Sequence, residues 1–173
     1  MPNFGFGTKE AQALAALVLA SAFGAPALAG EDADCASETR AANAATVRIV
    51  FEEILGKGRI DENEHIYHPD FVVHGPTRDY SRAEDRAASQ GWRQASPDMA
   101  VSVLQTVAAC DTVAVHYEVS GTNSGEGNGL PATGRPYRVR GMTVFGLRDG
   151  LIAEEWTVFD QYGMLKQLGL LPS

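Results

Sequence analysis

Acidic side chains beside apolar ones are the residues of this sequence best suited to proton transfer. Asp160 ends an alternating, strand-like stretch, and strict alternation would place Ile152, Trp156 and Val158 on its face. An apolar wall disfavours the ionised carboxylate and raises its pKa, which suits a base that removes a proton beside a carbonyl. The charge of Glu154, expected on the same face, would raise that pKa further if it lies close. Alternatively, Asp160 only caps the helical turn that follows it, a position where Asp is common.

Two histidines are candidates for assisting such a base, because imidazole can donate a hydrogen bond to an enolate oxygen or carry a proton. His74 stands before a Gly-Pro pair, and His116 lies within a second alternating stretch. In that stretch His116 falls on the face opposite Val115 and Tyr117. It is therefore a site residue if its face lines a pocket, and an ordinary surface residue if its face meets solvent.

Helices in the first half of the chain must position part of this machinery. The first predicted helix spans residues 38–55, and its apolar face consists of Val47, Val50, Phe51 and Ile54. Two capping-box spacings follow it. Asp61 with Glu64 predicts a short helix that ends before the next proline. Ser81 with Glu84 predicts a longer helix, which also ends ahead of a proline.

From residue 99 onward the apolar residues alternate, which predicts strands. These strands cover residues 99–107, 113–119, 137–147 and 151–160. Asp149-Gly150 has the preferred composition of a two-residue hairpin turn between the last two strands. Helices followed by such a meander indicate an α+β fold, in which N-terminal helices pack on a curved, antiparallel-rich sheet that encloses a pocket.

The composition excludes some classes of function. Of 173 residues, 22 are acidic and 14 are basic, so the formal net charge is -8. A nucleic-acid binder normally carries the opposite sign, and we expect no nucleic-acid partner. Cys35 and Cys110 lie too far apart in sequence to suggest a metal-binding cluster. In an oxidising compartment they are candidates for a disulfide, and otherwise they remain thiols.

An apolar leader precedes the predicted domain. Residues 11–24 form an apolar run, and Ala27-Leu28-Ala29 has the small-x-small pattern that signal peptidase reads. We therefore predict a signal peptide over residues 1–29, no membrane anchor, and a single exported domain over residues 30–173, in the periplasm or secreted. The alternative is a disordered alanine-rich arm.

Several short motifs resemble those of one known family. They are His68-Pro69-Asp70-Phe71-Val72-Val73-His74, Ser96-Pro97-Asp98, Gly121-Thr122-Asn123-Ser124-Gly125, Pro131-Ala132-Thr133-Gly134, and EEWTVFDQYGMLKQLG at residues 154–169. In order and spacing they resemble the SnoaL-like polyketide and ester cyclases, which belong to the NTF2-like superfamily together with ketosteroid isomerase. The resemblance spans roughly residues 47–172, and it implies an NTF2-like cone.

The resemblance also implies an activity, an intramolecular aldol ring closure in a carbonyl-containing small molecule, without metal or cofactor. It implies Asp160 as the acid and base, and it places His74 at a pocket histidine of the family. Further substrate contacts are predicted from Trp156, Tyr117, Met142 and Asn123. Asn123 stands where the family usually has a histidine, so this position lacks a titratable group.

A second class of function stays open, a non-catalytic exported protein of the same fold that binds a small apolar ligand. The fold alone does not choose between the two classes. The predicted signal peptide and Asn123 favour the binding protein, whereas the intact stretch of residues 156–160 favours the enzyme. The glycine-rich residues 121–136 are either a connector or a lid over the pocket. Either protein could form a homo-oligomer.

Overall fold

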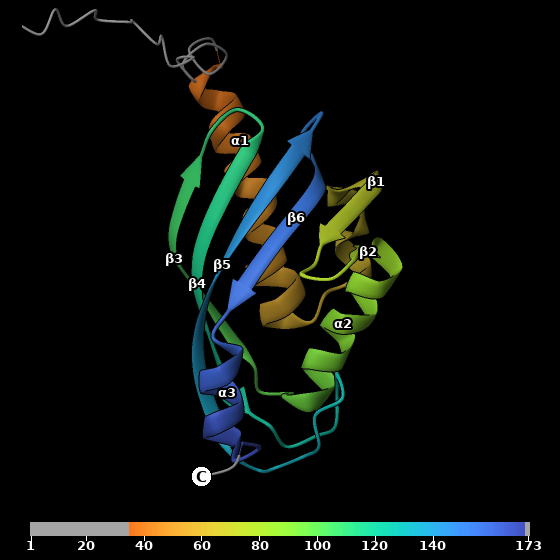
Figure 1. The fold of residues 1–173 in the computed structure, drawn as a ribbon. Coiled ribbons are helices and arrows are strands. Elements are labelled where there is room, and N and C mark those ends of the chain that lie inside the picture. The colour runs from red at the N-terminus through yellow and green to blue at the C-terminus, as the bar shows by residue number, and fades with distance from the viewer. Residues whose placement is uncertain (1–34, 172–173) are drawn as a thin grey trace, which may run out of the picture. The chain divides into compact units, whose positions relative to one another are not determined.

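One mixed sheet organises residues 35–171, the part of the chain that the computed structural model describes (Figure 1). Its strands lie in the order β2-β1-β6-β5-β4-β3. In chain order they are β1 Tyr67–His74, β2 Asp79–Ser81, β3 Ala100–Ala108, β4 Thr112–Thr122, β5 Pro136–Arg148 and β6 Leu151–Phe159. β1 runs parallel to β6, and the other neighbouring pairs are antiparallel. The predicted signal peptide, residues 1–29, lies outside the described residues.

The strands β3 to β6 are those that the alternating pattern predicts, and the α+β fold is confirmed. Along β5 the side chains alternate between exposed and buried. Asp149 and Gly150 join β5 to β6 with φ angles of 54° and 77°, as the predicted tight hairpin turn requires.

Strands β1 and β2 were not predicted. Pro69 lies near the start of β1 and interrupts its apolar pattern, since proline is rare inside strands. The parallel partner of β1 is β6, far away in sequence, so no short turn announces the pairing.

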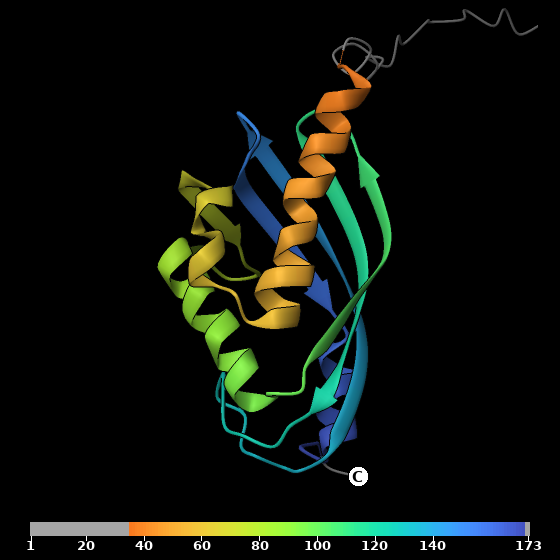
Figure 2. The same cartoon turned by 180° about the vertical axis from the view of Figure 1, so that it is seen from behind.

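Two helical segments cover one face of the sheet (Figure 2). Helix α1, Ser37–Ile49, continues directly through a π-helical turn, η2, Val50–Leu55, and together they confirm the helix predicted over residues 38–55. The predicted apolar face is buried, and it packs against inward side chains of β4, β5 and β6. This packing forms the main core; its fully buried members are Val47, Phe51, Ile54, Val113, Val115, Phe145 and Ile152.

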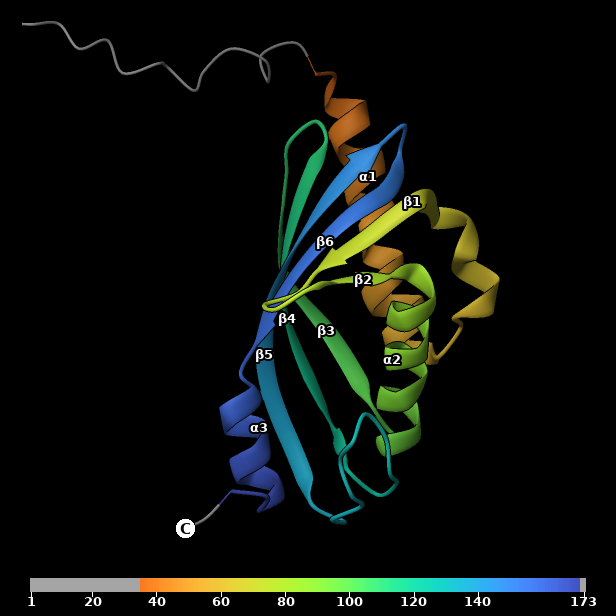
Figure 3. The same cartoon turned by 45° about the vertical axis from the view of Figure 1, so that its right-hand side comes forward.

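Helix α2, Arg82–Ala95, begins at the predicted capping box. The Ser81 hydroxyl accepts a hydrogen bond from the backbone N–H of Glu84, and the Glu84 carboxylate accepts one of 2.9 Å from the backbone N–H of Ser81. This reciprocal pair satisfies two backbone donors that the first turn would otherwise leave open. The helix therefore begins where the sequence predicts, directly after the short strand β2 (Figure 3).

The other predicted capping box is wrong. Asp61 and Glu64 lie in a 3-10 helix, η3, Asp61–Ile66, which has no side-chain cap. Their carboxylates instead form ion pairs with Arg86 and Arg82 of α2. The tertiary contact with two arginines replaces the local hydrogen bond that the spacing suggests.

A β-bulge in β6 decides which of its side chains face inward. Leu147 of β5 pairs with Ile152, and Gly146 pairs with Glu154, so Ala153 is an extra residue without a partner in the ladder. A bulge of this kind shifts the alternation by one position. The prediction that Ile152 shares a face with Trp156 is therefore wrong: Ile152 is fully buried, whereas Trp156 is exposed.

Helix α3, Gln161–Leu168, follows β6 and packs against β5. It contains the helical turn predicted over residues 164–168 and ends at Gly169, whose φ is 72°. Met164 and Leu168 pack against Tyr137 and Val139 in a second, smaller core cluster. Among the described residues, no helix is long and apolar enough to cross a membrane.

The two cysteines lie near the same end of the molecule. Cys35 precedes α1 and is a free thiol, so no disulfide joins it to Cys110 in this structure. Cys110 lies in the turn between β3 and β4, where its backbone carbonyl accepts a 2.5 Å hydrogen bond from the side-chain amide of Asn43 on α1.

Candidate functional site

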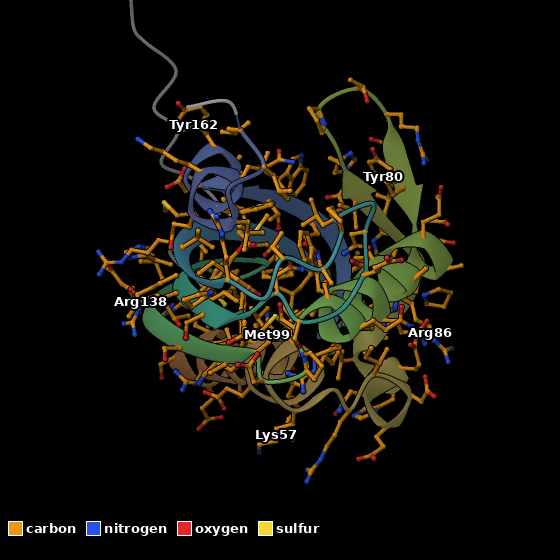
Figure 4. All side chains as sticks on the ribbon, turned by 90° about the horizontal axis from the view of Figure 1, so that it is seen from below. Lys57, Tyr80, Arg86, Met99, Arg138 and Tyr162 are labelled. Carbon is orange, nitrogen blue, oxygen red and sulfur yellow. The ribbon has the colours of Figure 1, made fainter. Side chains whose placement is uncertain are left out.

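A cavity of about 160 Å³ lies between α2, η2 and the inner face of the sheet. Its walls are mostly apolar and rich in aromatic rings; they include Phe51, Trp92, Met99, Tyr117, Tyr137, Phe145 and Phe159. In the view of Figure 4, the buried Met99 lies near the middle of the molecule, whereas Arg86, Arg138 and Tyr162 lie at its outer edge. Two carboxylic acids, Asp85 and Glu155, interrupt this apolar lining. An apolar lining with a few polar groups is the usual composition of a small-molecule pocket.

Glu155 reaches the cavity from β6 because of the bulge at Ala153. It pairs with Phe145 of β5, a fully buried inward residue, and side chains of directly paired residues lie on the same face. The Glu155 carboxylate accepts a 2.7 Å hydrogen bond from the hydroxyl of Thr157, which also lines the cavity. The carboxyl group is therefore held against the inner face, with one hydroxyl donor beside it.

A line of hydroxyl groups connects Glu155 with Tyr117 across three strands. The Thr157 hydroxyl lies 2.7 Å from that of Thr143 on β5, and Thr143 hydrogen-bonds the phenol of Tyr117 on β4. Gly141 makes this placement of Tyr117 possible, because a Cβ there would lie 2.5 Å from the Tyr117 hydroxyl oxygen. These contacts hold the phenol and the carboxyl in one polar strip on an otherwise apolar wall.

Asp85 enters the cavity from the opposite side, on α2. The lining residues of this helix are Asp85, Ala88, Ser89 and Trp92, which is the spacing of one helix face. Arg82, one turn earlier, forms an ion pair of 2.5 Å with the Asp85 carboxylate. The cavity thus has one carboxyl group on each of two facing walls, and an arginine holds one of them.

The pKa of Glu155 is raised to about 7, chiefly by burial and next by the negative charge of Asp85. The Thr157 hydrogen bond and the charge of Arg82 oppose this rise in the pKa. Burial also raises the pKa of Asp85, and Arg82 opposes that rise. A carboxyl group with a pKa near neutrality can both accept and return a proton, which is the property of a general acid and base.

Of the residues predicted from the sequence, Tyr117 lines this cavity and Asp160 does not. The carboxylate of Asp160 is exposed and accepts a 2.8 Å hydrogen bond from the backbone N–H of Gly163, so it caps α3. Together with His116 and Met142 it borders a shallow groove on the outer face of the sheet. The structure therefore brings three of the predicted residues together, but on the side away from the cavity.

His74 and Trp156 form a second cluster on the outer face. Their rings stack with centroids 4.5 Å apart and planes inclined by 18°. The imidazole nitrogens of His74 lie 3.1 Å from the Asp79 carboxylate and 3.3 Å from that of Glu154. These contacts tie β2 and β1 to β6, and neither His74 nor Trp156 lines the cavity.

Asn123 is buried and anchors the glycine-rich loop between β4 and β5. Its side-chain oxygen accepts 2.9 Å hydrogen bonds from the backbone N–H and the hydroxyl of Thr133, and its amide donates to the carbonyl of Gly125. The loop packs along α2 (Figure 3): the Gly125 N–H donates to the carbonyl of Ala95 at the end of the helix, and the Asn128 amide donates to that of Ala88 near its middle. It is a strap packed on α2, and none of its residues lines the cavity.

Glu155 and Asp85 are site residues that the sequence patterns did not predict. Asp85 carries a usable signal, because it shares a helix face with Ser89 and Trp92 in a helix whose start was predicted. Glu155 carries none, since regular alternation would have placed it on the face opposite Ile152. Its inward position depends on the bulge.

Helices packed on a curved, mostly antiparallel sheet define a class of proteins, those with an NTF2-like cone. Within that class the chain belongs to the SnoaL-like polyketide cyclase family, whose model matches residues 45–168. The resemblance predicted from the motifs and the predicted fold are both confirmed. No curated protein gives a significant match.

Solved structures agree with this assignment. IdmH from Streptomyces antibioticus, a candidate polyketide cyclase, is 30% identical with a TM-score of 0.64, over 73% of this chain and 98% of its own. AclR from Streptomyces galilaeus, a candidate hydroxylase, is 25% identical with a TM-score of 0.70, over 78% of this chain and 85% of its own. A candidate SnoaL-like polyketide cyclase from Jannaschia sp. CCS1 shares the fold, with 23% identity and a TM-score of 0.71 over 79% of this chain and 98% of its own.

Proposed function

We propose that this protein is a cyclase-type enzyme that moves protons on a carbonyl-containing small molecule held in the cavity, with Glu155 as the proton-transfer group. The observation that carries this proposal is the Glu155 carboxyl group in an apolar cavity beside a second acid. The raised pKa of Glu155 supports the same role. A carboxylate whose pKa lies near neutrality is basic enough to take a proton and is still present in its ionised form. The family, and the name of IdmH, support a cyclase-type reaction.

The proposed reaction begins when the Glu155 carboxylate takes a proton from the carbon beside a carbonyl group, which leaves an enolate. The enolate carbon then attacks a second carbonyl carbon of the same molecule, so a carbon–carbon bond forms and an alkoxide results. The carboxylic acid of Glu155 returns the proton to that alkoxide. The phenol of Tyr117 would donate a hydrogen bond to the enolate oxygen. No electrons enter or leave the system.

The exchange of carbon-bound hydrogen for deuterium tests the first step without knowledge of the natural substrate. We choose 2-tetralone, a two-ring ketone with acidic hydrogens beside its carbonyl, and follow its exchange in D₂O by proton NMR. The wild type should accelerate the exchange, and Glu155→Gln should lower the protein-dependent rate by about 100-fold or more, the usual scale for a lost general base. Asp160→Asn is the matched variant, because it removes the carboxylate that the family resemblance implies while an amide still caps α3.

Each result decides between the candidates. Exchange that disappears in Glu155→Gln and persists in Asp160→Asn supports the proposal. The reverse pattern assigns the reaction to Asp160. If the wild type binds 2-tetralone but does not accelerate exchange, the protein is a non-catalytic binding protein and the proposal is rejected.

We also propose that the protein is exported, from the apolar run and Ala27-Leu28-Ala29. N-terminal sequencing of the protein isolated from its natural host should begin at Gly30. A chain that keeps Met1 in the cytoplasmic fraction would contradict export.

A further inference from the structure

Helix α2 carries an ion pair at the cavity wall, in which Asp85 faces the cavity and Arg82 lies behind it. Asp85 lines the cavity, whereas Arg82 does not. The guanidinium of Arg82 approaches the Asp85 carboxylate to 2.5 Å, and the two side chains are only 17% and 19% exposed. Asp85 therefore lies between Arg82 and the cavity, in an environment where solvent screens charges weakly.

Arg82 is fixed in this position by three further contacts. Its guanidinium donates hydrogen bonds of 3.1 and 2.9 Å to the two carboxylate oxygens of Glu64, and it lies 3.6 Å above the centre of the Tyr67 ring. A bidentate pair and a stacked ring hold a guanidinium rigidly. The hydrogen bonds of the Arg82 side chain within residues 35–171 thus go to Asp85 and Glu64, and none goes to Glu155.

The groups that act on Glu155 come from several elements. On its own strand the Thr157 hydroxyl donates to it, from α2 the charges of Asp85 and Arg82 reach it, and the phenols of Tyr67 and Tyr117 interact with its charge. Arg82 therefore stabilises the ionised form of Asp85 by its charge and by a hydrogen bond. It stabilises the ionised form of Glu155 by its charge alone. This difference favours an ionised Asp85 and a protonated Glu155.

We propose that Asp85 is a positioning residue for proton transfer: held ionised by Arg82, its carboxylate raises the proton affinity of Glu155. The two acids then carry a single proton between them below neutrality, and Glu155 releases that proton near neutrality, where its carboxylate acts as the base. The inference deepens the proposed function, on which its catalytic meaning rests. Two like charges across a small apolar cavity destabilise each other, so the doubly ionised state is disfavoured. The Arg82 contact decides which acid keeps the proton.

The protonation states of the two acids test this inference directly. The full chain would be labelled with ¹³C at the side-chain carboxyl carbons of Asp and Glu, and each carbon would be titrated by NMR, with Glu155→Gln and Asp85→Asn identifying the two signals. In the wild type, Asp85 should ionise at clearly lower pH than Glu155. A wild-type protein in which Asp85 titrates last, or in which both acids ionise together at the usual pH of exposed carboxyl groups, would overturn the inference.

Variants then test the coupling by its sign. Asp85→Asn removes the repelling charge, so the Glu155 midpoint should move to lower pH by about one unit, a tenfold loss of proton affinity. Arg82→Gln should move the midpoints of both acids to higher pH. Asp85→Glu and Arg82→Lys keep the charges and should restore the wild-type midpoint of Glu155 in large part.

A matched control is available on the same helix. Arg86 also pairs with a carboxylate, that of Asp61, but it does not line the cavity. Arg86→Gln should leave the Glu155 midpoint unchanged. Should Asp85→Asn also leave it unchanged, Asp85 has no influence on Glu155 and the inference fails. If Asp85→Asn does not fold, the wild-type titration and the Arg82 variants still decide the question.

The deuterium-exchange rate gives a second, functional readout. The pH at which the exchange of 2-tetralone rises should follow the Glu155 midpoint in each variant, to lower pH for Asp85→Asn and to higher pH for Arg82→Gln. Absence of exchange in every protein would reject the proposed function but not the proton sharing, which the carboxyl titration measures independently. Normal exchange with unshifted midpoints would reject the proton sharing but not the function.

Discussion

Ile152 and Glu155 face the same side of β6, although three positions separate them. Ile152 pairs with Leu147 and Glu155 pairs with Phe145, two inward residues of β5, and the unpaired Ala153 takes up the odd position between them. The bulge turns a carboxyl group into the apolar cavity and turns Trp156 out of it. The chemistry that we propose for this cavity depends on that single extra residue.

Stability should depend on pH through Glu155. Its pKa is about 7 in the folded protein and near the ordinary value of about 4.5 in the unfolded chain, so the folded state binds the proton more tightly. The contribution of Glu155 to stability is therefore fully present below pH ~4.5, falls as pH rises toward neutrality, and is lost above about pH 7. Urea unfolding of wild type and Glu155→Gln between pH 5 and 8 measures it.

In that comparison, Glu155→Gln should lose less stability than the wild type as the pH rises. The difference should reach at most about 3 kcal/mol, from ~1.4 kcal/mol per unit of pKa, and less where solvent screens the half-buried group. Parallel pH curves for the two proteins would contradict a raised pKa at Glu155.

Asp160 should contribute to stability as the cap of α3. Asp160→Ala removes the acceptor for the Gly163 N–H and should cost about 1 kcal/mol of the free energy of unfolding, whereas Asp160→Asn should cost little. Urea unfolding of both variants separates the cap from the charge. A large loss of stability in Asp160→Asn would show that the carboxylate does more than cap the helix.

Gly141 should be required for the placement of Tyr117. In Gly141→Ala the new Cβ would lie 2.5 Å from the Tyr117 ring and hydroxyl, so the ring must move, at a cost of about 1–3 kcal/mol for an overpacked interior. Gly146→Ala on the same strand is the control, because its nearest contact is the flexible carboxylate of Glu154 at 3.0 Å. Thermal or urea unfolding should rank Gly141→Ala clearly below Gly146→Ala, and equal stabilities would refute the packing argument.

Tyr117→Phe isolates the phenol from the packing. The variant keeps the ring against Gly141 and removes the hydroxyl that Thr143 contacts. We expect near-normal stability and slower exchange of 2-tetralone, by about 10-fold or more, if the phenol donates to the enolate oxygen. An unchanged exchange rate would remove Tyr117 from the reaction and leave it as part of the cavity wall.

Local signals in the sequence account for much of the fold. The capping box at Ser81 and Glu84 marks the start of α2, the apolar spacing of Val47 to Ile54 marks the helix that covers the sheet, and Asp149-Gly150 marks the last hairpin turn. Each of these depends on residues within a few positions of one another, so the physical cause is present in a short stretch of chain. The alternation of β4, uninterrupted at Tyr117, likewise places Tyr117 and His116 on opposite faces, but it does not say which face is the inner one.

The site depends on contacts that a short stretch of chain does not contain. The pairing of β1 with β6 joins segments from the two halves of the chain, and the bulge at Ala153 exists only in the ladder between β5 and β6. Glu64 forms an ion pair with Arg82 instead of capping η3, because α2 packs beside that turn. The sequence by itself therefore determined the helices, the strands β3 to β6 and the family. Tertiary structure decided where β1 and β2 form and which carboxyl groups face the cavity, since backbone pairing between strands sets the direction of every side chain along them.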